Sequence, residues 1–164
     1  MNATGLSKAL KMTDTEQYKT ALGKAMTLCS KREYCFEDIR IKLEQWGLNS
    51  GDSNKILNTL ARENFINEIR YAEAYARDKF RYNKWGKIKI FAMLRSRKIP
   101  ADIISSALNS IDDKQYIDTI SDLLKNHRRT IKAKNQYDLK AKLLRFGLSK
   151  GFERNILYDL IGED

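Results

Sequence analysis

The sequence predicts an all-α protein of three tandem three-helix repeats, each about 50 residues long, which together form a curved, elongated helical solenoid. Apolar residues recur at helical spacing along most of the 164 residues, and glycine and proline are scarce, at eight and one. A set of apolar anchors also recurs at a nearly fixed interval, because Leu43, Leu94 and Leu143 are offset by 51 and 49 residues. Such a period is typical of tandem supersecondary units.

The anchors of the middle and last helices repeat in the same order in all three units. The middle-helix anchors are Ile39, Leu43 and Leu48, then Ile90, Leu94 and Ile99, then Leu139, Leu143 and Leu148, and the last-helix anchors are Ile56 and Leu60, Ile104 and Leu108, and Ile156 and Leu160. Coincidence among leucine-rich amphipathic helices is the alternative explanation. Two agreeing patterns with similar offsets favour a true repeat.

The first repeat is expected over residues 15–66, after a polar tail at residues 1–14. Its first helix runs from Thr15 to about Ser30 on apolar periodicity. The second spans residues 36–46 and is capped by Gly47, and the third spans residues 53–63.

The central repeat is expected over residues 67–112. A helix from Asn67 places an apolar stripe toward the core, and its members are Ile69, Ala72, Ala76 and Phe80. The chain breaks at Trp85-Gly86, and a second helix follows through Ile90 and Leu94. Pro100 suits the first turn of the third helix.

The third repeat is expected over residues 113–164. Asp112 and Gln115 resemble a capping box before a long helix over residues 113–132. Asn135 can cap the middle helix, and Gly147 is expected to end it, as Gly47 ends its counterpart. His127, the only histidine, falls on the apolar side of the long helix, where a core or boundary position explains it better than a general base does.

Positive charge is concentrated in two stretches of a chain whose net charge is +10. Residues 77–98 hold nine Lys or Arg and one acid, and residues 125–145 hold eight and one, whereas residues 1–68 are nearly balanced at ten and nine. Two basic clusters on a balanced background favour a polyanionic partner such as DNA. A solvated basic helix face is the alternative for either cluster alone.

The candidate nucleic-acid-binding or filament-binding residues are the cations in and beside these stretches, with one aromatic residue among them. They are Arg70, Arg77, Lys79, Arg81, Lys84, Trp85, Lys87, Lys89, Arg95, Arg97 and Lys98 in the central repeat, and Lys125, Arg128, Arg129, Lys132 and Lys134 in the third. Aromatic rings among Lys and Arg can stack on unpaired bases. For Trp85 and Tyr82, base stacking and core packing stay equally open, and for Tyr75 core packing is favoured.

Patterns for catalysis and metal binding are absent from the sequence. It contains no Gly-rich phosphate loop, no HExxH and no Gly-x-Ser-x-Gly. Cys29, Cys35 and one histidine are too few ligands for a zinc site, and two cysteines do not form a disulfide framework. No secretory or membrane-spanning segment is visible. We therefore expect a cytoplasmic, non-enzymatic protein with reduced thiols and without a metal or other cofactor.

Three motifs resemble those of the RecX family of bacterial recombination regulators. They are Phe65-Ile66-Asn67-Glu68-Ile69-Arg70-Tyr71-Ala72, Trp85-Gly86-x-x-Lys89-Ile90-x3-Leu94 and Glu37-Asp38-Ile39-Arg40-x-x-Leu43-x3-Gly47. The resemblance covers about residues 17–162. The chain departs from the family pattern at Asn67-Glu68, where two acids are usual, at Cys35, where a serine is expected, and at Lys98, where a glycine usually follows the second middle helix.

The resemblance implies a non-enzymatic modulator of the RecA recombinase in DNA repair, recombination and the SOS response. Such proteins dock in the groove of the RecA–DNA filament, limit its growth, and lower its strand-exchange, ATPase and coprotease activities. The implied partners are the RecA filament and single- and double-stranded DNA, and we expect a monomer. A stand-alone, sequence-tolerant DNA-binding protein is the first alternative. A helical adaptor whose basic faces meet an acidic protein is the second.

Overall fold

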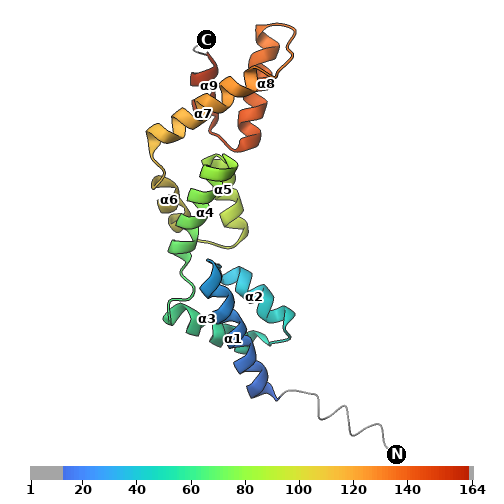
Figure 1. Cartoon of the computed structure of the whole chain (residues 1–164), viewed down its shortest axis with the longest axis vertical. Helices are drawn as coiled ribbons and strands as arrows, with labels where there is room; N and C mark the ends of the chain where they lie inside the picture. The colour runs from blue at the N-terminus through green and yellow to red at the C-terminus, as the bar shows by residue number, and fades with distance from the viewer. Residues whose placement is uncertain (1–12, 163–164) are drawn as a thin grey trace, which may run out of the picture. The chain divides into compact units, whose positions relative to one another are not determined.

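The computed structural model describes residues 13–162, and every regular element in that range is an α-helix (Figure 1). These helices are α1 (Asp14–Lys31), α2 (Phe36–Gln45), α3 (Ser50–Arg62), α4 (Glu68–Asn83), α5 (Lys87–Ser96), α6 (Ala101–Asn109), α7 (Asp113–Arg128), α8 (Gln136–Lys150) and α9 (Arg154–Gly162). The predicted all-α class is confirmed. The predicted tail over residues 1–14 lies outside the described residues except for its end, where Asp14 already begins α1.

The chain divides into two compact units, one ending at Asn67 and the other beginning at Glu68. The first unit packs α1, α2 and α3 around one apolar core, whose fully buried members include Ala25, Ile39, Leu43, Ile56 and Leu60. A capping box begins α1, because the Thr13 hydroxyl accepts from the Glu16 N–H and the Glu16 carboxylate accepts from the Thr13 N–H.

Gly47 ends the middle helix of the first unit as predicted. Its φ of +87° lies in the left-handed region, where a side chain would be strained. The Leu48 N–H then donates to the Leu43 carbonyl at 3.1 Å, which closes the end of the helix. Leu48 is thereby brought into the core.

Helix α4 opens the second unit and buries a stripe that shifts along its length. Ala72, Ala76 and Phe80 are buried as predicted, but Ile69 is 54% exposed and its predicted core position is wrong. Tyr71 is buried near that end instead. At the far end of α4, Phe80 packs its ring 5.5 Å from that of Tyr116 on α7.

Two glycines join the triplet α4–α6 to the triplet α7–α9. The Gly86 N–H donates to the Lys150 carbonyl at 2.7 Å, and the Ile88 N–H donates to the Gly151 carbonyl at 3.0 Å. A Cβ on Gly86 would lie 2.2 Å from the Gly151 carbonyl carbon, so only glycine permits this approach. We call the Gly86–Gly151 contact the glycine junction.

A buried tyrosine reinforces the glycine junction. The Tyr116 hydroxyl accepts from the Lys87 N–H at 3.0 Å and donates to the Glu153 carboxylate at 2.6 Å. Burial, more than this bond to Glu153, raises the pKa of Tyr116, so the hydroxyl keeps its proton. The ring also packs edge-on against Phe152, at 5.9 Å between centroids. The two triplets of the second unit are therefore tied by backbone and side-chain bonds together.

Helix α8 does not end at Gly147, so that prediction is wrong. The helix continues to Lys150, and Gly151 ends it with a φ of +90°. Gly147 is instead a packing residue, because a Cβ there would lie 2.3 Å from Cδ2 of Leu157 on α9. The close approach of α8 to α9 explains why glycine stands inside a helix.

One helix boundary and one buried side differ from the predictions in the third triplet. Helix α7 stops at Arg128 instead of residue 132, and the Thr130 N–H closes it on the His127 carbonyl. The buried residues of α9 are Leu157 and Ile161, one position beyond the predicted anchors Ile156 and Leu160. The side of α9 that faces the core is therefore rotated by one residue from the predicted side.

The predicted helix starts of this triplet are confirmed. Asp112 accepts from the Gln115 N–H at 2.8 Å, and Asn135 accepts from the Asp138 N–H at 2.9 Å. No helix within residues 13–162 is long and apolar enough to cross a membrane.

Candidate nucleic-acid interface

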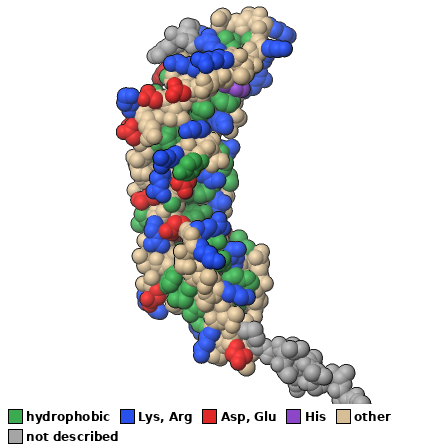
Figure 2. Space-filling model, in the orientation of Figure 1, with side chains coloured by type: hydrophobic (Ala, Val, Ile, Leu, Met, Phe, Trp, Pro, Cys, Tyr) green, Lys and Arg blue, Asp and Glu red, His purple; other side chains and the backbone are tan. Residues whose placement is uncertain are grey.

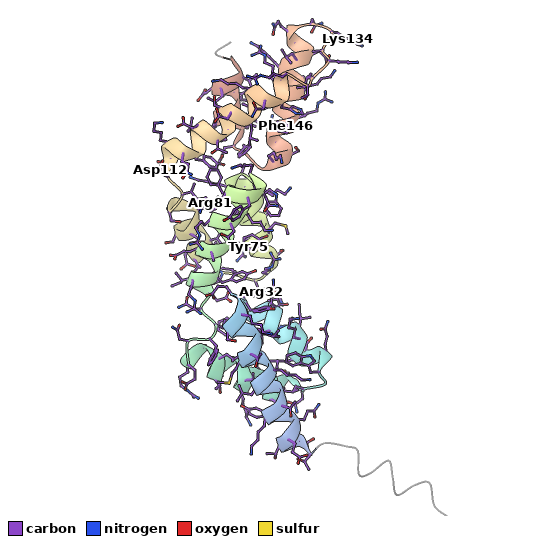
Figure 3. All side chains as sticks on the ribbon, in the orientation of Figure 1. Arg32, Tyr75, Arg81, Asp112, Lys134 and Phe146 are labelled. Carbon is purple, nitrogen blue, oxygen red and sulfur yellow. The ribbon has the colours of Figure 1, made fainter. Side chains whose placement is uncertain are left out.

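Cations and aromatic rings converge where α4 meets α5. The Lys79 ammonium lies 4.9 Å from the centroid of the Trp85 ring, and the Lys89 ammonium lies 4.6 Å from the same ring. Lys79 also lies 5.5 Å from the ring of Tyr75, and the Arg97 guanidinium lies 4.9 Å from it. We call Tyr75, Lys79, Trp85, Lys89 and Arg97 the central cluster; Figure 3 labels Tyr75. All of these residues except Tyr75 were predicted from the sequence as candidate binding residues.

The aromatic partners of the central cluster leave its two lysines charged and able to bind an anion. Across residues 13–162, neither Lys79 nor Lys89 lies within ion-pair distance of a carboxylate. A cation over an aromatic face gains about 0.5–1 kcal/mol at an exposed site and keeps its full charge. The rings therefore orient two lysines without neutralising them, an arrangement suited to phosphate.

Trp85 is half-buried, a position between the exposed ring that base stacking requires and the buried ring that core packing requires. The two lysines lie over its ring, which leaves less of that ring for stacking on a base. Tyr82 is 73% exposed, so core packing is excluded for it, and Arg81 lies 5.8 Å from its ring. Tyr75 is half-buried and packs its ring 6.0 Å from that of Tyr71.

Two predicted cations of the central stretch support the fold directly. The Lys87 ammonium lies 4.7 Å from the Tyr116 ring and 3.8 Å from the Asp113 carboxylate, with 22% of its side chain exposed. Arg95 donates to the Ile99 carbonyl at 3.0 Å. Both contacts use the group that would meet a phosphate, so these two residues are weaker candidates than Lys79 and Lys89.

The remaining candidates of the central stretch lie outside the central cluster. Arg77 is exposed beside Asp78, at 3.6 Å. Three other candidates, Arg81, Lys84 and Lys98, are also exposed, and a fourth, Arg70, is half-buried. Lys84 and Lys98 have φ values of +57° and +61°, each just past the end of a helix. Their binding role stays a prediction.

The candidates of the third triplet lie at the end of α7 and in the turn to α8. Lys125, Arg129, Lys132 and Lys134 are exposed, and Arg128 is half-buried. Figure 2 shows Lys and Arg side chains over this end of the second unit, and Figure 3 places Lys134 at the turn. Cations at the C-terminal end of a helix are also favoured by its dipole.

A hollow of about 470 Å³ between α7 and α8 gathers residues that the sequence argument did not select. It is lined by His127, Ile131, Lys132, Lys142, Arg145, Phe146 and Ser149. Only Lys132 was a candidate. The spacing of Lys142, Arg145, Phe146 and Ser149 is the signal that could have identified them, because residues three and four apart share one face of a helix.

The rings of His127 and Phe146 lie face to face in this hollow, with centroids 3.8 Å apart and planes 11° apart. His127 is half-buried, which confirms its predicted boundary position. The Lys142 ammonium donates to the Lys132 carbonyl at 2.7 Å and to the Asp138 carboxylate at 3.0 Å. Asp138 accepts from the Lys134 N–H, and this bond, followed by Lys142, holds the pKa of Asp138 below its ordinary value.

The central cluster lies inside a recognisable domain. Residues 67–108 match the family model described as "RecX, second three-helix domain". A protein named regulatory protein RecX, from Clostridium perfringens strain 13, is 32% identical over 119 residues, which are 71% of this chain and 55% of that protein. The chain belongs to the RecX family. The resemblance seen in the sequence is therefore confirmed.

Other RecX relatives extend the likeness over most of the chain. A regulatory protein RecX from Legionella pneumophila is 26% identical over 145 residues, which are 87% of this chain and 93% of that protein. The crystal structure of RecX from Lactobacillus salivarius has a TM-score of 0.79 at 22% identity, over 91% of this chain, and shows the same fold. The chain spans about half the length of the Clostridium perfringens relative.

Proposed function

We propose that this protein regulates the RecA recombinase by binding the RecA–DNA filament and lowering its strand-exchange, ATPase and coprotease activities. The observation that carries the proposal is the RecX second three-helix domain at residues 67–108, which holds the central cluster. In this proposal the protein acts without catalysis, as a monomer in the cytoplasm. Its repeats divide near residues 66 and 112, each between two helices.

The charge distribution supports binding to a filament that contains DNA. Phosphate contacts by Lys and Arg supply most of the sequence-tolerant affinity of proteins for DNA. The basic stretches 77–98 and 125–145 both lie in the second unit, where the glycine junction ties one triplet to the other. Two linked sites on one polyanion bind more tightly than either alone, because the second contact becomes intramolecular.

Titration into an ATPase assay with RecA-coated single-stranded DNA tests this function. We expect the ATPase rate and strand exchange to fall at low stoichiometry to RecA. Charge reversal at two exposed residues of α4, Arg77→Glu with Arg81→Glu, is expected to weaken inhibition without changing helicity. The matched control reverses two exposed lysines of the first unit, Lys19→Glu with Lys55→Glu. If the intact protein in excess leaves the filament ATPase unchanged, regulation of RecA is disproved.

A stand-alone DNA-binding protein remains the second candidate, because the two basic stretches need no recombinase partner to bind DNA. Both candidates predict single- and double-strand binding with a steep salt dependence. For about six neutralised phosphates, the slope of log affinity against log salt is about −5. A flat salt response would instead support the helical adaptor that binds an acidic protein.

A further inference from the structure

The hollow between α7 and α8 is lined by two aromatic rings that lie face to face. His127 and Phe146 form that stack, and both rings line the hollow. Ile131 adds an apolar wall beside them. The Lys150 ammonium also lies 6.0 Å from the centroid of the Phe146 ring. A flat aromatic surface of this kind suits a planar group that can extend the stack by one member.

The rim of the hollow is cationic. Lys132 and Arg145 are exposed there, whereas the third cation, Lys142, is held by Asp138 and by the Lys132 carbonyl. Lys142 thus fixes the turn that carries Lys132, and Lys132 and Arg145 remain to meet a ligand. Asp138 is the one acid between residues 125 and 145, so the local charge strongly favours an anion.

We propose that this hollow binds one unpaired nucleotide of single-stranded nucleic acid, with the base on the His127–Phe146 stack and its phosphate between Lys132 and Arg145. The proposal rests on the proposed binding of DNA and adds a second, base-contacting site to it. Aromatic stacking with a cationic groove is how proteins hold single strands without reading sequence. The hollow is shallow and open to solvent, so a nucleotide would lie on it without being enclosed.

The shape of the site favours a single strand over a duplex. In a duplex each base is stacked on its neighbours, and reaching a ring pair on the protein would require unstacking it at a cost in free energy. An unpaired base has an open face. An acidic peptide would satisfy Lys132 and Arg145 but would leave the aromatic stack without a planar partner, so a nucleotide fits the two features together.

Fluorescence anisotropy with three probes of equal length tests the proposal: an oligo-dT strand, a single strand of the same phosphates without bases, and a duplex. We expect the intact protein to bind oligo-dT about five- to tenfold more tightly than the base-free strand. Phe146→Leu keeps an apolar side chain but removes the ring, so it should abolish that preference and leave binding of the base-free strand unchanged. The matched control is Tyr137→Leu on the same helix, because Tyr137 is 85% exposed and outside the hollow.

A second variant keeps the test independent of folding. Arg145 is exposed, so Arg145→Gln should leave the melting temperature unchanged and lower affinity for both single strands severalfold. Equal affinity for oligo-dT and the base-free strand would overturn the nucleotide site while leaving DNA binding intact. Absence of binding to all three probes would overturn the proposed DNA binding as well. Competition by polyglutamate as strong as that by oligo-dT would overturn the site in favour of an acidic protein partner.

Discussion

Helices α2 and α5 are the middle helices of two triplets that follow one another in the sequence, and they have similar buried sides but opposite charge patterns. In α2, Glu37 and Asp38 lie in the first turn, and Arg40 bonds to both Glu37 and Glu44. Hydrogen bonding to Glu37 is the main cause of the raised pKa of Arg40. In α5 the first turn contains no acid and begins with lysine.

The difference in first-turn charge shows that α5, in the second unit, departs from the sequence that would best stabilise a helix. The N-terminal end of a helix carries partial positive charge, so acids stabilise it and lysines destabilise it by about 0.3–1 kcal/mol each. Helix α2 follows this rule, and α5 breaks it with Lys87 and Lys89. Lys87 is explained by its contacts with Tyr116 and Asp113. The backbone and Cβ of Lys89 pack against Gly151, but within residues 13–162 its ammonium lies over the Trp85 ring without a carboxylate partner. Local conflicts of this kind are expected at binding sites.

The largest expected effect tests whether the buried sides of the two helices are packed alike. Leu43 and Leu94 are both fully buried. Replacement of either by alanine should lower the free energy of unfolding by about 2–5 kcal/mol, through lost apolar burial and the cavity that remains. Urea denaturation followed by circular dichroism measures this. A loss below about 1 kcal/mol for one leucine alone would show that the two interiors are packed differently.

The next effect tests whether the solvent-facing sides of the two helices differ in their contribution to DNA binding. Lys79→Ala with Lys89→Ala removes the two lysines over Trp85, and we expect affinity for DNA to fall on the order of tenfold, at about 1 kcal/mol or less per contact. The salt slope should become shallower by about 0.9 for each phosphate lost.

The matched control is Arg40→Ala with Lys42→Ala on α2, which removes the same number of charges. Arg40 is already paired with two glutamates, so this change should alter DNA affinity less than twofold. If both double variants weaken binding equally, overall charge governs affinity and the central cluster has no special role.

The elements that sequence reasoning predicted correctly depend on neighbours close in the chain. The helix starts at Asp112 and Asn135 are local, because each side chain bonds to an N–H three residues later. The cap at Gly47 is also local, because it depends on the positive φ of one glycine and on the bond from the Leu48 N–H to the Leu43 carbonyl. By contrast, Gly147 resembles a helix end in the sequence but lies inside α8. Glycine is needed there because Leu157 of α9 packs against it, which the sequence does not show.

The candidate site was predicted only in part for the same physical reason. Charge density along the chain pointed to Lys79 and Lys89, and the structure places both on Trp85. Charge density does not show that Lys87 and Arg95 are engaged by the fold. It also does not show that the end of α7 lies against α8, so the hollow containing Phe146 was missed.

A smaller effect is expected at the caps of the middle helices. Gly47, Lys98 and Gly151 all have positive φ after their helices, and Lys98 alone carries a side chain there. Lys98→Gly should raise the free energy of unfolding by about 0.5–1 kcal/mol, because left-handed backbone is strained for lysine and not for glycine. Lys98→Ala is the control, since it removes the charge but keeps the Cβ. An equal gain from alanine would assign the effect to charge instead of backbone strain.

The smallest effect concerns the acid that organises the cations of the third triplet, as Glu37 does for Arg40 in α2. The pKa of Asp138 in the folded protein is held below its ordinary value of 3.8, chiefly by the Lys134 N–H. Its stabilising contribution is therefore complete above the ordinary pKa and is lost as the pH falls through the lower, folded pKa.

Hydrogen exchange at the Lys134 amide should speed up below about pH 4 relative to the intrinsic rate. Asp138→Asn should show the faster exchange already at pH 6 and no further transition, because its amide does not titrate. If the pH dependence survives in that variant, another carboxylate controls the turn and Lys132 is not positioned through Asp138 and Lys142.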